Sequence, residues 1–353
     1  MSFRVNSLRK VAVLVAITSF LRTRVSLLGP KPGSSLGRLA RELARAFDRI
    51  SLLIFRICFD SASLVVLLIG VTPYRILKSI ISTPKDKTTQ FKTILITGSS
   101  AGIGAGLAQR YAAPGTTLHL LAYNDPELEK IAERCRDQGS IVETYDADVR
   151  NQDLIRSIVD NIERRSCIDL VIANAGIAPK RCGIEEAHLV FDVNVMGVMN
   201  TVLPVLQYMR ARKRGQIALM SSLGGYAPAT NRYMASYVAT KTAIRAFGEG
   251  LRNSLSSEGI GVTVVCPGFT KSKMTDYLIA KGCKLYGLWN NAKATAYMKD
   301  GIDSNYPEVA FPLSLYIISR LVGNMPDWQR DLMLPMLRVG DPFMVMDNNV
   351  REE

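Results

Sequence analysis

Hydrophobic and polar positions alternate differently before and after residue 92. From there on, short apolar runs are followed by longer segments in which apolar residues recur every three or four positions. Short buried strands that alternate with amphipathic helices predict a doubly wound parallel sheet of the α/β class. The expected strands are 91–97, 116–123, 140–149, 168–176, 215–222, 260–268 and 306–311, with helices that include 125–138, 151–165, 185–212 and 235–259.

The first ninety residues follow another pattern. Residues 11–21 form an uncharged run that is too short to span a bilayer. In 36–54, apolar residues share one helical face and arginines another, which predicts a basic amphipathic helix that lies on an anionic membrane or docks on the following domain. Residues 50–72 are long enough for a span, but Arg56 and Asp60 interrupt them, so a span stays open. A cleaved organelle presequence is the alternative to membrane association.

The charge of the chain is unevenly distributed. Residues 1–92 carry 16 Lys and Arg against 4 Asp and Glu, whereas residues 93–353 carry 28 against 27. Of the net charge of +13, residues 1–92 contribute +12, and the balanced main body argues against a nucleic-acid partner. The 353 residues are 48% hydrophobic, which is enough for one large domain with a sizeable core.

Cysteine and histidine usage argues against several kinds of site. The six cysteines are scattered without a CxxC pair, which predicts neither a disulfide framework nor a zinc site. The chain has only two histidines, His119 and His188, which are far apart in the sequence. This shortage makes a histidine-based metal site and a Ser-His-Asp triad improbable, so we expect no metal.

A glycine-rich turn follows the first expected strand and opens a helix. In TGSSAGIG, Gly98, Gly102 and Gly104 are spaced Gly-x3-Gly-x-Gly. Glycines let the backbone approach a pyrophosphate closely, and the N-terminus of the following helix attracts that anion. Because the turn lies in a continuing βαβ pattern, it predicts a Rossmann-like dinucleotide-binding site.

A tyrosine and a lysine lie one helical turn apart in SYVATK, at Tyr237 and Lys241. Alone, such a pair is typical of any amphipathic surface helix. Its context is more specific, because six motifs occur in order: TGSSAGIG, NAG at 174–176, FDVNVMG at 191–197, MSS at 220–222, YVATK, and PGF at 267–269. This ordered set resembles the short-chain dehydrogenase/reductase family over roughly residues 92–275, about half of the chain.

The resemblance implies an NAD(P)-dependent oxidoreductase and gives roles to individual residues. Tyr237 would be the general acid/base, with a pKa lowered by Lys241, which would also hold the nicotinamide ribose. Ser222 would hydrogen-bond the substrate oxygen, but it lies fifteen residues before Tyr237, slightly more than usual, so Ser221 is an alternative. Asn194 would keep a water in the proton relay to Lys241.

The same resemblance implies the residues that contact the cofactor. Asp148 would contact the adenine, with capping of the next helix as a rival explanation, and Thr270 would bind the nicotinamide carboxamide. Gly176 would lie beside the adenosine ribose or be there only for the turn. The full expected set is Thr97, Gly98, Ser100, Gly102, Ile103, Gly104, Asp148, Val149, Asn174, Ala175, Gly176, Tyr237, Lys241, Pro267, Gly268 and Thr270.

The choice between NAD and NADP depends on the end of the second expected strand. An acid there would bind the ribose 2′-hydroxyl and select NAD, whereas a nearby arginine would accept the 2′-phosphate of NADP. Ala122 and Tyr123 occupy these positions, and Asp125 is better explained as a helix cap. We favour NADP because no acid repels the additional phosphate.

The substrate region follows the PGF motif. Residues 268–300 are apolar and aromatic, which predicts either ordinary helix packing or a pocket for a lipid-like alcohol or ketone. The apolar C-terminal helices are interpreted as a cap over the substrate mouth or as a second membrane contact. The predicted organisation is a hydrophobic and basic extension (1–82), a linker (83–91), a catalytic NAD(P)-binding domain (92–312) and C-terminal helices with a tail (313–353).

The sequence therefore predicts a membrane-associated oxidoreductase that transfers a hydride between nicotinamide and a hydroxyl or carbonyl group of a hydrophobic substrate, such as a lipid, steroid or retinoid. A non-catalytic nucleotide-binding scaffold or sensor is one alternative, which the intact Ser, Asn, Tyr and Lys set disfavours. A sugar-nucleotide-modifying enzyme is another, but it usually has a different glycine spacing and a larger substrate domain. The expected partners are the small-molecule substrate and a membrane surface, and a homodimer stays open.

Overall fold

The computed structural model describes residues 91–179, 186–227, 234–280, 285–326, 328 and 330. The chain divides into two compact units, Met1–Thr83 and Pro84–Glu353, and all described residues belong to the second. The predicted amphipathic helix at 36–54, the candidate span at 50–72 and the C-terminal tail beyond 330 lie outside the described residues.

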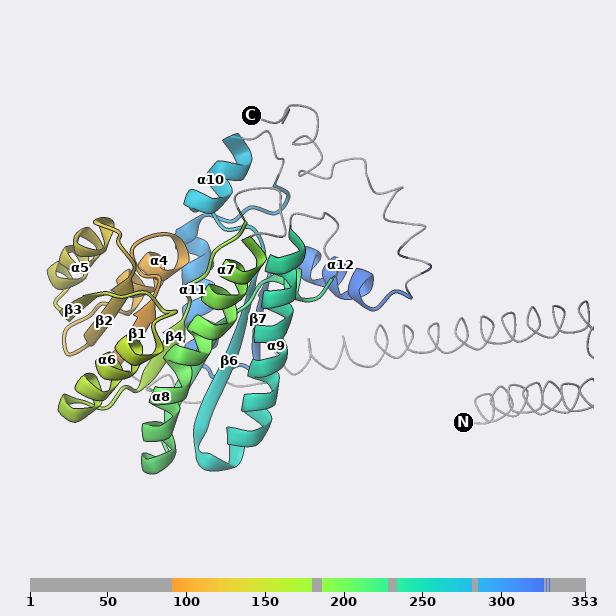
Figure 1. Ribbon diagram of the computed structural model, residues 1–353. Coiled ribbons are helices and arrows are strands. Elements are labelled where there is room, and N and C mark those ends of the chain that lie inside the picture. Colours follow the sequence, from red (N-terminus) through yellow and green to blue (C-terminus); the bar gives the residue numbers. More distant parts are fainter. Residues whose placement is uncertain are drawn as a thin grey trace, which may run out of the picture. The chain divides into compact units, whose positions relative to one another are not determined.

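A seven-stranded sheet forms the centre of the described domain, in the order β3-β2-β1-β4-β5-β6-β7 (Figure 1). Every neighbouring pair is parallel, which confirms the predicted doubly wound α/β fold. All seven expected strands are present. They are β1 (Thr93–Thr97), β2 (Thr117–Ala122), β3 (Ile141–Asp146), β4 (Leu170–Ala173), β5 (Gly215–Met220), β6 (Ile260–Pro267) and β7 (Glu308–Phe311).

Helices cover both faces of this sheet (Figure 1). Helices α4, α5 and α11 share one hydrophobic cluster with the sheet, and α6, α8 and α9 share the other. The helices are α4 (Gly102–Tyr111), α5 (Glu127–Asp137), α6 (Gln152–Arg165), α7 (Ala187–Phe191), the π-helix η3 (Asp192–Met196), α8 (Gly197–Arg212), the 3-10 helix η4 (Leu223–Gly225), α9 (Ala235–Leu255), the 3-10 helix η6 (Ser256–Glu258), α10 (Lys273–Ala280), α11 (Asn291–Asp303) and α12 (Leu313–Gly323).

The five strands β1, β2, β4, β5 and β6 are buried on both faces, since successive side chains point to opposite sides of the sheet and helices cover both sides, whereas the edge strand β3 is partly exposed. In β1, Ile94 and Ile96 pack in the cluster of α4, whereas Leu95 packs in the cluster of α6 and α8. All three side chains are fully buried. The continuous apolar runs that predicted the strands are thus the central layer of a three-layer domain.

The order of the strands creates one special position. Strand β1 lies between β2 and β4, so the chain changes its direction across the sheet at this point. In open α/β sheets, such a switch point leaves a crevice at the carboxyl ends of the strands, where ligands bind. The glycine turn 98–104 follows β1 and the NAG motif 174–176 follows β4, so the topology brings these two motifs together.

Residues 187–212 form one long helical stretch in which the π-helix η3 joins α7 and α8. By length and composition Ala187–Arg212 could cross a membrane, and it is the one such helix in the part of the chain described above. However, 56% of its most apolar window is buried inside the domain, where α8 contacts α6 and β4. The stretch is therefore a core helix, with apolar residues that face the sheet.

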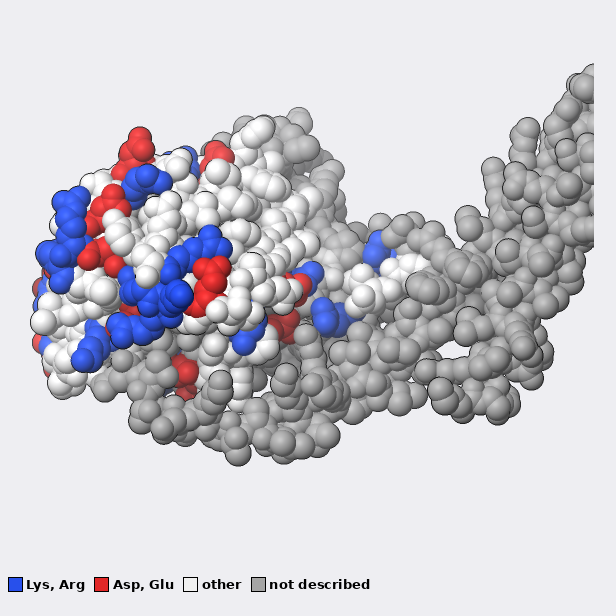
Figure 2. All heavy atoms as spheres, turned by 90° about the horizontal axis from the view of Figure 1, so that it is seen from below, with Lys and Arg blue, Asp and Glu red and all other residues white. Residues whose placement is uncertain are grey.

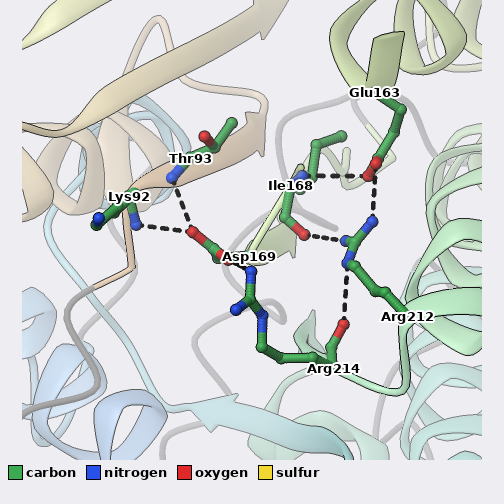
Figure 3. A network of polar contacts seen from close by, with 7 residues as sticks. All are labelled: Lys92, Thr93, Glu163, Ile168, Asp169, Arg212 and Arg214. Carbon is green, nitrogen blue, oxygen red and sulfur yellow. Dashed lines mark hydrogen bonds and ion pairs between the residues drawn. The ribbon is translucent and has the colours of Figure 1, made fainter. Parts of the chain in front are cut away.

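Lysines and arginines gather on the face at the amino ends of the strands (Figure 2). Beneath them, a polar network joins the starts of β1 and β4 to the end of α8 (Figure 3). Asp169 Oδ2 accepts hydrogen bonds from the backbone amides of Lys92 and Thr93, at 2.9 and 3.2 Å. Arg212 Nη1 lies 2.7 Å from Glu163 Oε2, and the Glu163 side chain is only 2% exposed. The Glu163 charge is therefore stabilised by this arginine.

We expect Arg212→Met to lower the free energy of unfolding by about 3–5 kcal/mol, because it leaves the Glu163 carboxylate buried without its cation. Arg214→Met is the matched control, since the Arg214 side chain is 70% exposed and its guanidinium lies 3.4 Å from Asp169. That exposed pair is worth about 1 kcal/mol or less. Urea denaturation of the full-length protein, followed by tryptophan fluorescence, measures both losses, and equal losses would contradict the special role of Arg212.

Candidate active site

The glycine turn is shaped by contacts that leave no room for side chains. Gly98 and Gly102 have φ angles of +65° and +56°, in the left-handed region that favours glycine. A Cβ on Gly104 would lie 2.1 Å from the carbonyl oxygen of Gly98, so α4 starts directly against the end of β1. Helix α4 has no side-chain cap at Ala101 and no acid in its first turn. Its positive end is therefore uncompensated by the helix itself, which suits a cofactor pyrophosphate.

Asn174 fastens the end of β4 to this turn. Its side-chain amide donates hydrogen bonds to the carbonyl oxygens of Thr97 and Gly98, at 2.9 and 3.0 Å. In return, the Thr97 hydroxyl accepts hydrogen bonds from the backbone amides of Asn174 and Ala175, both at 3.1 Å. Four residues expected at the cofactor thus also hold the crevice in shape.

A glycine is required at position 176 because the side chains of Asn194 and Lys241 lie very close to its backbone. Its φ lies outside the left-handed region, and a Cβ there would lie 3.1 Å from Asn194 Oδ1 and 3.2 Å from Lys241 Nζ. The chain after β4 therefore passes between two of the predicted catalytic side chains. Any larger residue at this position would push them apart.

Asn194 is fully buried in the π-helix η3. Its Oδ1 accepts a hydrogen bond from the backbone amide of Ile177 at 2.8 Å, and its Nδ2 donates to the Ile177 carbonyl at 2.9 Å and to the Thr240 hydroxyl at 3.1 Å. Both amide hydrogens are used, so one lone pair of Oδ1 remains for the water predicted in the relay. Single π-turns of this kind are frequent at functional sites.

The two serines after β5 have different surroundings. Ser221 is buried, and its hydroxyl donates a hydrogen bond to the backbone carbonyl of Lys241 at 2.7 Å. The Ser222 hydroxyl accepts a hydrogen bond from the Gly224 amide at 3.1 Å, and it also forms a hydrogen bond with Tyr237, which acts to lower the tyrosine pKa. Ser222 is therefore the serine beside Tyr237, despite the spacing of fifteen residues.

Lys241 is buried on α9 against the end of β5. Its Nζ donates a hydrogen bond to the Met220 carbonyl at 3.0 Å and lies 5.6 Å from the centre of the Tyr237 ring. Burial lowers the pKa of Lys241 to about 8, against a smaller opposing influence of Cys266. The charge of this lysine is consequently sensitive to changes near neutral pH.

Burial raises the pKa of Tyr237 above its ordinary value, and only the Ser222 hydrogen bond opposes this rise. The direction is opposite to the prediction that Lys241 lowers this pKa. The cause is the desolvation of the phenolate on burial, and Lys241, whose Nζ lies 5.6 Å from the centre of the ring and makes no hydrogen bond to the hydroxyl, does not offset it. Tyr237 is therefore a protonated phenol at neutral pH, in the form that can donate a proton.

Thr270 carries a buried hydroxyl that has no hydrogen-bond partner among the described residues. It follows Pro267 and Gly268 at the end of β6, where the Gly268 amide donates to the Phe311 carbonyl at 2.7 Å. Because nearly all buried hydroxyls are hydrogen-bonded, this group indicates a missing partner. The carboxamide of a nicotinamide would provide one, so these residues fit the predicted cofactor.

The adenine side of the predicted site contains an ion pair that the sequence did not indicate. The Asp148 carboxylate accepts hydrogen bonds from the Arg150 guanidinium at 2.6–3.1 Å, and this pairing lowers the pKa of Asp148. Asn151 caps α6 instead, by accepting a hydrogen bond from a backbone amide of the first turn. The rival explanation of Asp148 as the helix cap is therefore wrong. The next residue, Val149, is buried, and a Cβ on Gly197 would lie 2.5 Å from it.

The ribose side is formed by the end of β2, the glycine turn and the start of α10. The N-cap of α5 is Pro126 rather than the predicted Asp125, which lies one residue earlier, but the Asp125 carboxylate still accepts a hydrogen bond from the Glu127 amide at 3.0 Å. The other carboxylate oxygen lies 3.8 Å from Lys273 Nζ, and Ser100 also hydrogen-bonds this carboxylate. Asp125 thus has partners of its own in the described domain, beside the strand end at Ala122.

Thr240 positions the catalytic groups and was not predicted from the sequence. Its hydroxyl donates a hydrogen bond to the Tyr237 carbonyl at 2.7 Å and accepts one from Asn194. It therefore links α9 to the π-helix. The position i+3 from Tyr237 on the same helix is the only sequence signal that could have indicated it.

Tyr226 also makes contacts near the site that no sequence motif indicated. Its hydroxyl hydrogen-bonds Glu308 and lies 3.5 Å from Cys266 Sγ. The guanidinium groups of Arg245 and Arg320 lie 4.7 and 4.9 Å from its ring centre. Tyr226 thus connects the loop after Ser222 to β7, α9 and α12.

Comparison with known proteins identifies this arrangement. Residues 92–281 match the short chain dehydrogenase family. An uncharacterized oxidoreductase of Myxococcus xanthus is 31% identical over 242 residues, which cover 67% of this chain and 94% of that protein. The 11-beta-hydroxysteroid dehydrogenase 1A of Arabidopsis thaliana is 35% identical over 209 residues, which cover 57% of this chain and 59% of that protein. The chain thus matches about three fifths of the length of this plant relative.

Solved structures agree with the fold. A short-chain dehydrogenase from Sphingobium yanoikuyae in complex with NADPH superimposes with a TM-score of 0.58 and 25% identity, over 70% of this chain and 96% of that one. The fold and the cofactor crevice define an NAD(P)-dependent oxidoreductase. More narrowly, the chain belongs to the short-chain dehydrogenase/reductase family.

We expect Gly104→Ala to weaken nucleotide binding at least tenfold, or about 1.4 kcal/mol, because the added Cβ meets the Gly98 carbonyl and displaces the turn. Gly250→Ala on α9 is the matched control, since a Cβ there meets nothing within 4 Å. Titration with reduced nicotinamide dinucleotide, followed by its fluorescence, measures both affinities. Unchanged affinity of the Gly104 variant would contradict the assignment of this turn.

Proposed function

We propose that this enzyme transfers a hydride between a nicotinamide cofactor and a hydroxyl or carbonyl group of a hydrophobic substrate. The observation that carries the proposal is the contact between Ser222 and Tyr237, next to the buried Lys241, at the carboxyl ends of the strands. A hydroxyl pair of this kind binds a carbonyl oxygen from two sides and delivers a proton to it.

In the direction of reduction, Ser222 donates a hydrogen bond to the substrate oxygen and Tyr237 donates the proton. A nicotinamide held by the glycine turn and Thr270 would supply the hydride to the carbonyl carbon. Lys241 then favours the phenolate that Tyr237 becomes, and a water on the remaining lone pair of Asn194 Oδ1 would supply the proton that restores the phenol, through a relay that includes Lys241. Burial raises the Tyr237 pKa, so the protein alone holds the phenol in its protonated form, which is the form that donates a proton in a reduction.

The surroundings of the site support an apolar substrate. Tyr277 and Ile279 on α10 and Leu313 and Ile318 on α12 are exposed apolar side chains. Trp289 instead stacks on Phe311 at 4.7 Å between ring centres, so it serves packing. Relatives named hydroxysteroid dehydrogenases favour a steroid-like ketone or alcohol within the class of lipid-like substrates.

NADP is our proposed cofactor. The strand end at Ala122 offers no carboxylate, and the neighbouring Asp125 is partly neutralised by Lys273. The structural relative from Sphingobium yanoikuyae contains NADPH, whereas a 3-oxoacyl-[acyl-carrier protein] reductase from Brucella melitensis, at 24% identity and a TM-score of 0.54, contains NAD. Since these two relatives differ in their cofactor, the proposal of NADP rests on Ala122, Asp125 and Lys273.

Attachment to a membrane through the first 92 residues is proposed on composition. These residues hold most of the basic excess and the long apolar run at 50–72. A basic amphipathic helix combined with an apolar segment binds bilayers much more firmly than either alone.

We expect Tyr237→Phe to reduce kcat at least a hundredfold, about 2.7 kcal/mol, while nucleotide affinity stays within about twofold. The ring is retained and only the proton donor is lost. Turnover of a panel of steroid and acyl ketones with NADPH and NADH, followed by absorbance of the reduced nicotinamide, provides the rates. A variant that retains more than about a tenth of kcat would remove Tyr237 from the proton transfer.

Ala122→Asp should shift the enzyme toward NAD, because a carboxylate at the strand end repels a 2′-phosphate and accepts a hydrogen bond from a 2′-hydroxyl. The ratio of kcat/KM for the two cofactors measures the shift. Ala122→Asn, of similar size but uncharged, is the control for steric effects. An unchanged ratio in the Asp variant would show that the ribose lies elsewhere.

A further inference from the structure

The face at the amino ends of the strands carries a cluster of cationic side chains (Figure 2). We call it the basic face and define it by six residues that are all exposed: Lys92, Arg164, Arg165, Arg210, Lys213 and Arg214. They come from the start of β1, the end of α6 and the end of α8 with the turn that follows it. Three segments far apart in the sequence therefore contribute to one surface.

The acidic partners of this surface lie deeper than the basic groups. Glu163 is almost fully buried, and Asp169 is 19% exposed and accepts backbone hydrogen bonds from the start of β1 (Figure 3). These two carboxylates face the interior, whereas Glu143 and Glu258, the partners of Arg165 and Arg210, are 35% and 33% exposed, and the guanidinium of Arg214 remains 70% exposed. The outermost charge of the face is positive, although residues 93–353 as a whole are nearly neutral.

Three members of the basic face make no ion pair within the described residues. Arg165 and Arg210 pair with Glu143 and Glu258, but Lys92, Arg164 and Lys213 have no such contact there. Arginines at the ends of α6 and α8 complement the negative ends of these helices, which explains part of the cluster. Lys213 is the C-cap of α8 and complements that helix end as well, whereas Lys92 and Arg214 lie outside the helices and are not explained in this way.

The connection of the chain indicates what this surface meets. Lys92 immediately precedes β1, so the preceding ninety residues enter the domain at the basic face. Those residues include an apolar run at 50–72 and a basic amphipathic pattern at 36–54. The polar segment 82–90 spans at most about 30 Å when fully extended. A membrane-bound N-terminal region would thus hold the basic face close to lipid headgroups.

We propose that the basic face binds the headgroups of an anionic lipid bilayer. This goes beyond membrane attachment by the N-terminal region, because it assigns lipid contact to the catalytic domain itself. Basic side chains next to a membrane-bound segment are attracted to anionic headgroups over about one Debye length. In this orientation the carboxyl ends of the strands, and the catalytic groups with them, point away from the bilayer.

The exposed Cys167 lies between α6 and β4, next to the basic face, and reports on the contact. In a full-length protein with Cys58, Cys182 and Cys283 replaced by Ser, a fluorophore on Cys167 is exposed to quenching by headgroup-labelled lipid. We expect strong quenching on phosphatidylserine-containing vesicles, weak quenching on phosphatidylcholine vesicles, and relief at high salt. The same label on Asp276→Cys, on α10 after the carboxyl end of β6, should stay unquenched in a protein in which Cys167 is also replaced by Ser.

The charge variant replaces Lys92, Arg164 and Lys213 by Glu, which breaks no ion pair among the described residues. Each basic residue near an anionic surface raises the equilibrium constant for the docked orientation roughly fivefold. Removal of three such residues should therefore lower this constant by about a hundredfold. The control replaces Lys130, Lys271 and Lys273 by Glu, with the same change in net charge on the side of the carboxyl ends of the strands, and it also removes the exposed Lys130–Glu127 ion pair and the Lys273–Asp125 contact. Only the first variant should lose quenching at Cys167.

Two results would overturn the proposal. Equal quenching in both charge variants would show that the orientation does not depend on the basic face. Displacement of the protein from vesicles by a short single-stranded RNA that binds this face would indicate a nucleic-acid partner. Vesicle co-sedimentation reports separately on the N-terminal region, so a failure of membrane attachment is distinguished from a failure of this contact.

Discussion

The contact between the end of β1 and the end of β4 is the constraint on which the rest of the site depends. Asn174 bridges the two strand ends, and the missing side chain of Gly104 lets α4 begin against Gly98. The same junction directs Gly176 between Asn194 and Lys241. Because β1 and β4 are neighbours only at the switch point of the sheet, cofactor site and catalytic residues are positioned by one topological feature.

Helix α9 is positioned by polar groups that point at backbone atoms rather than at other charges. Ser221 holds the carbonyl of Lys241, Lys241 holds the carbonyl of Met220, and Thr240 joins the helix to Asn194. These bonds set the rotation of α9 relative to β5, so Tyr237 faces Ser222. Their partners are backbone carbonyls or uncharged groups, so the catalytic pair is held in place without a neighbouring carboxylate that would compete for Lys241.

The fold could be predicted because apolar runs and glycine spacing are local properties of the chain, as in TGSSAGIG and the run before it. The Tyr237 and Lys241 pair was visible as a helical spacing, but its meaning came from resemblance. The rise of the Tyr237 pKa could not be predicted, because it depends on burial created by distant segments. The Tyr226 contact with Glu308 joins residues 82 positions apart, and no local pattern indicates such a pair.

The burial of Lys241 also favours its uncharged amine, which is the nucleophilic form of a lysine. An ordinary lysine has a pKa of about 10.4 and is almost entirely charged in the cell, whereas one at about 8 is partly neutral. Uncharged amines attack acylating reagents, and exposed lysines of ordinary pKa compete poorly near neutral pH. Small electrophiles that reach the crevice would therefore acylate this side chain selectively, and covalent labelling of Lys241 would reveal which molecules in a mixture occupy the site.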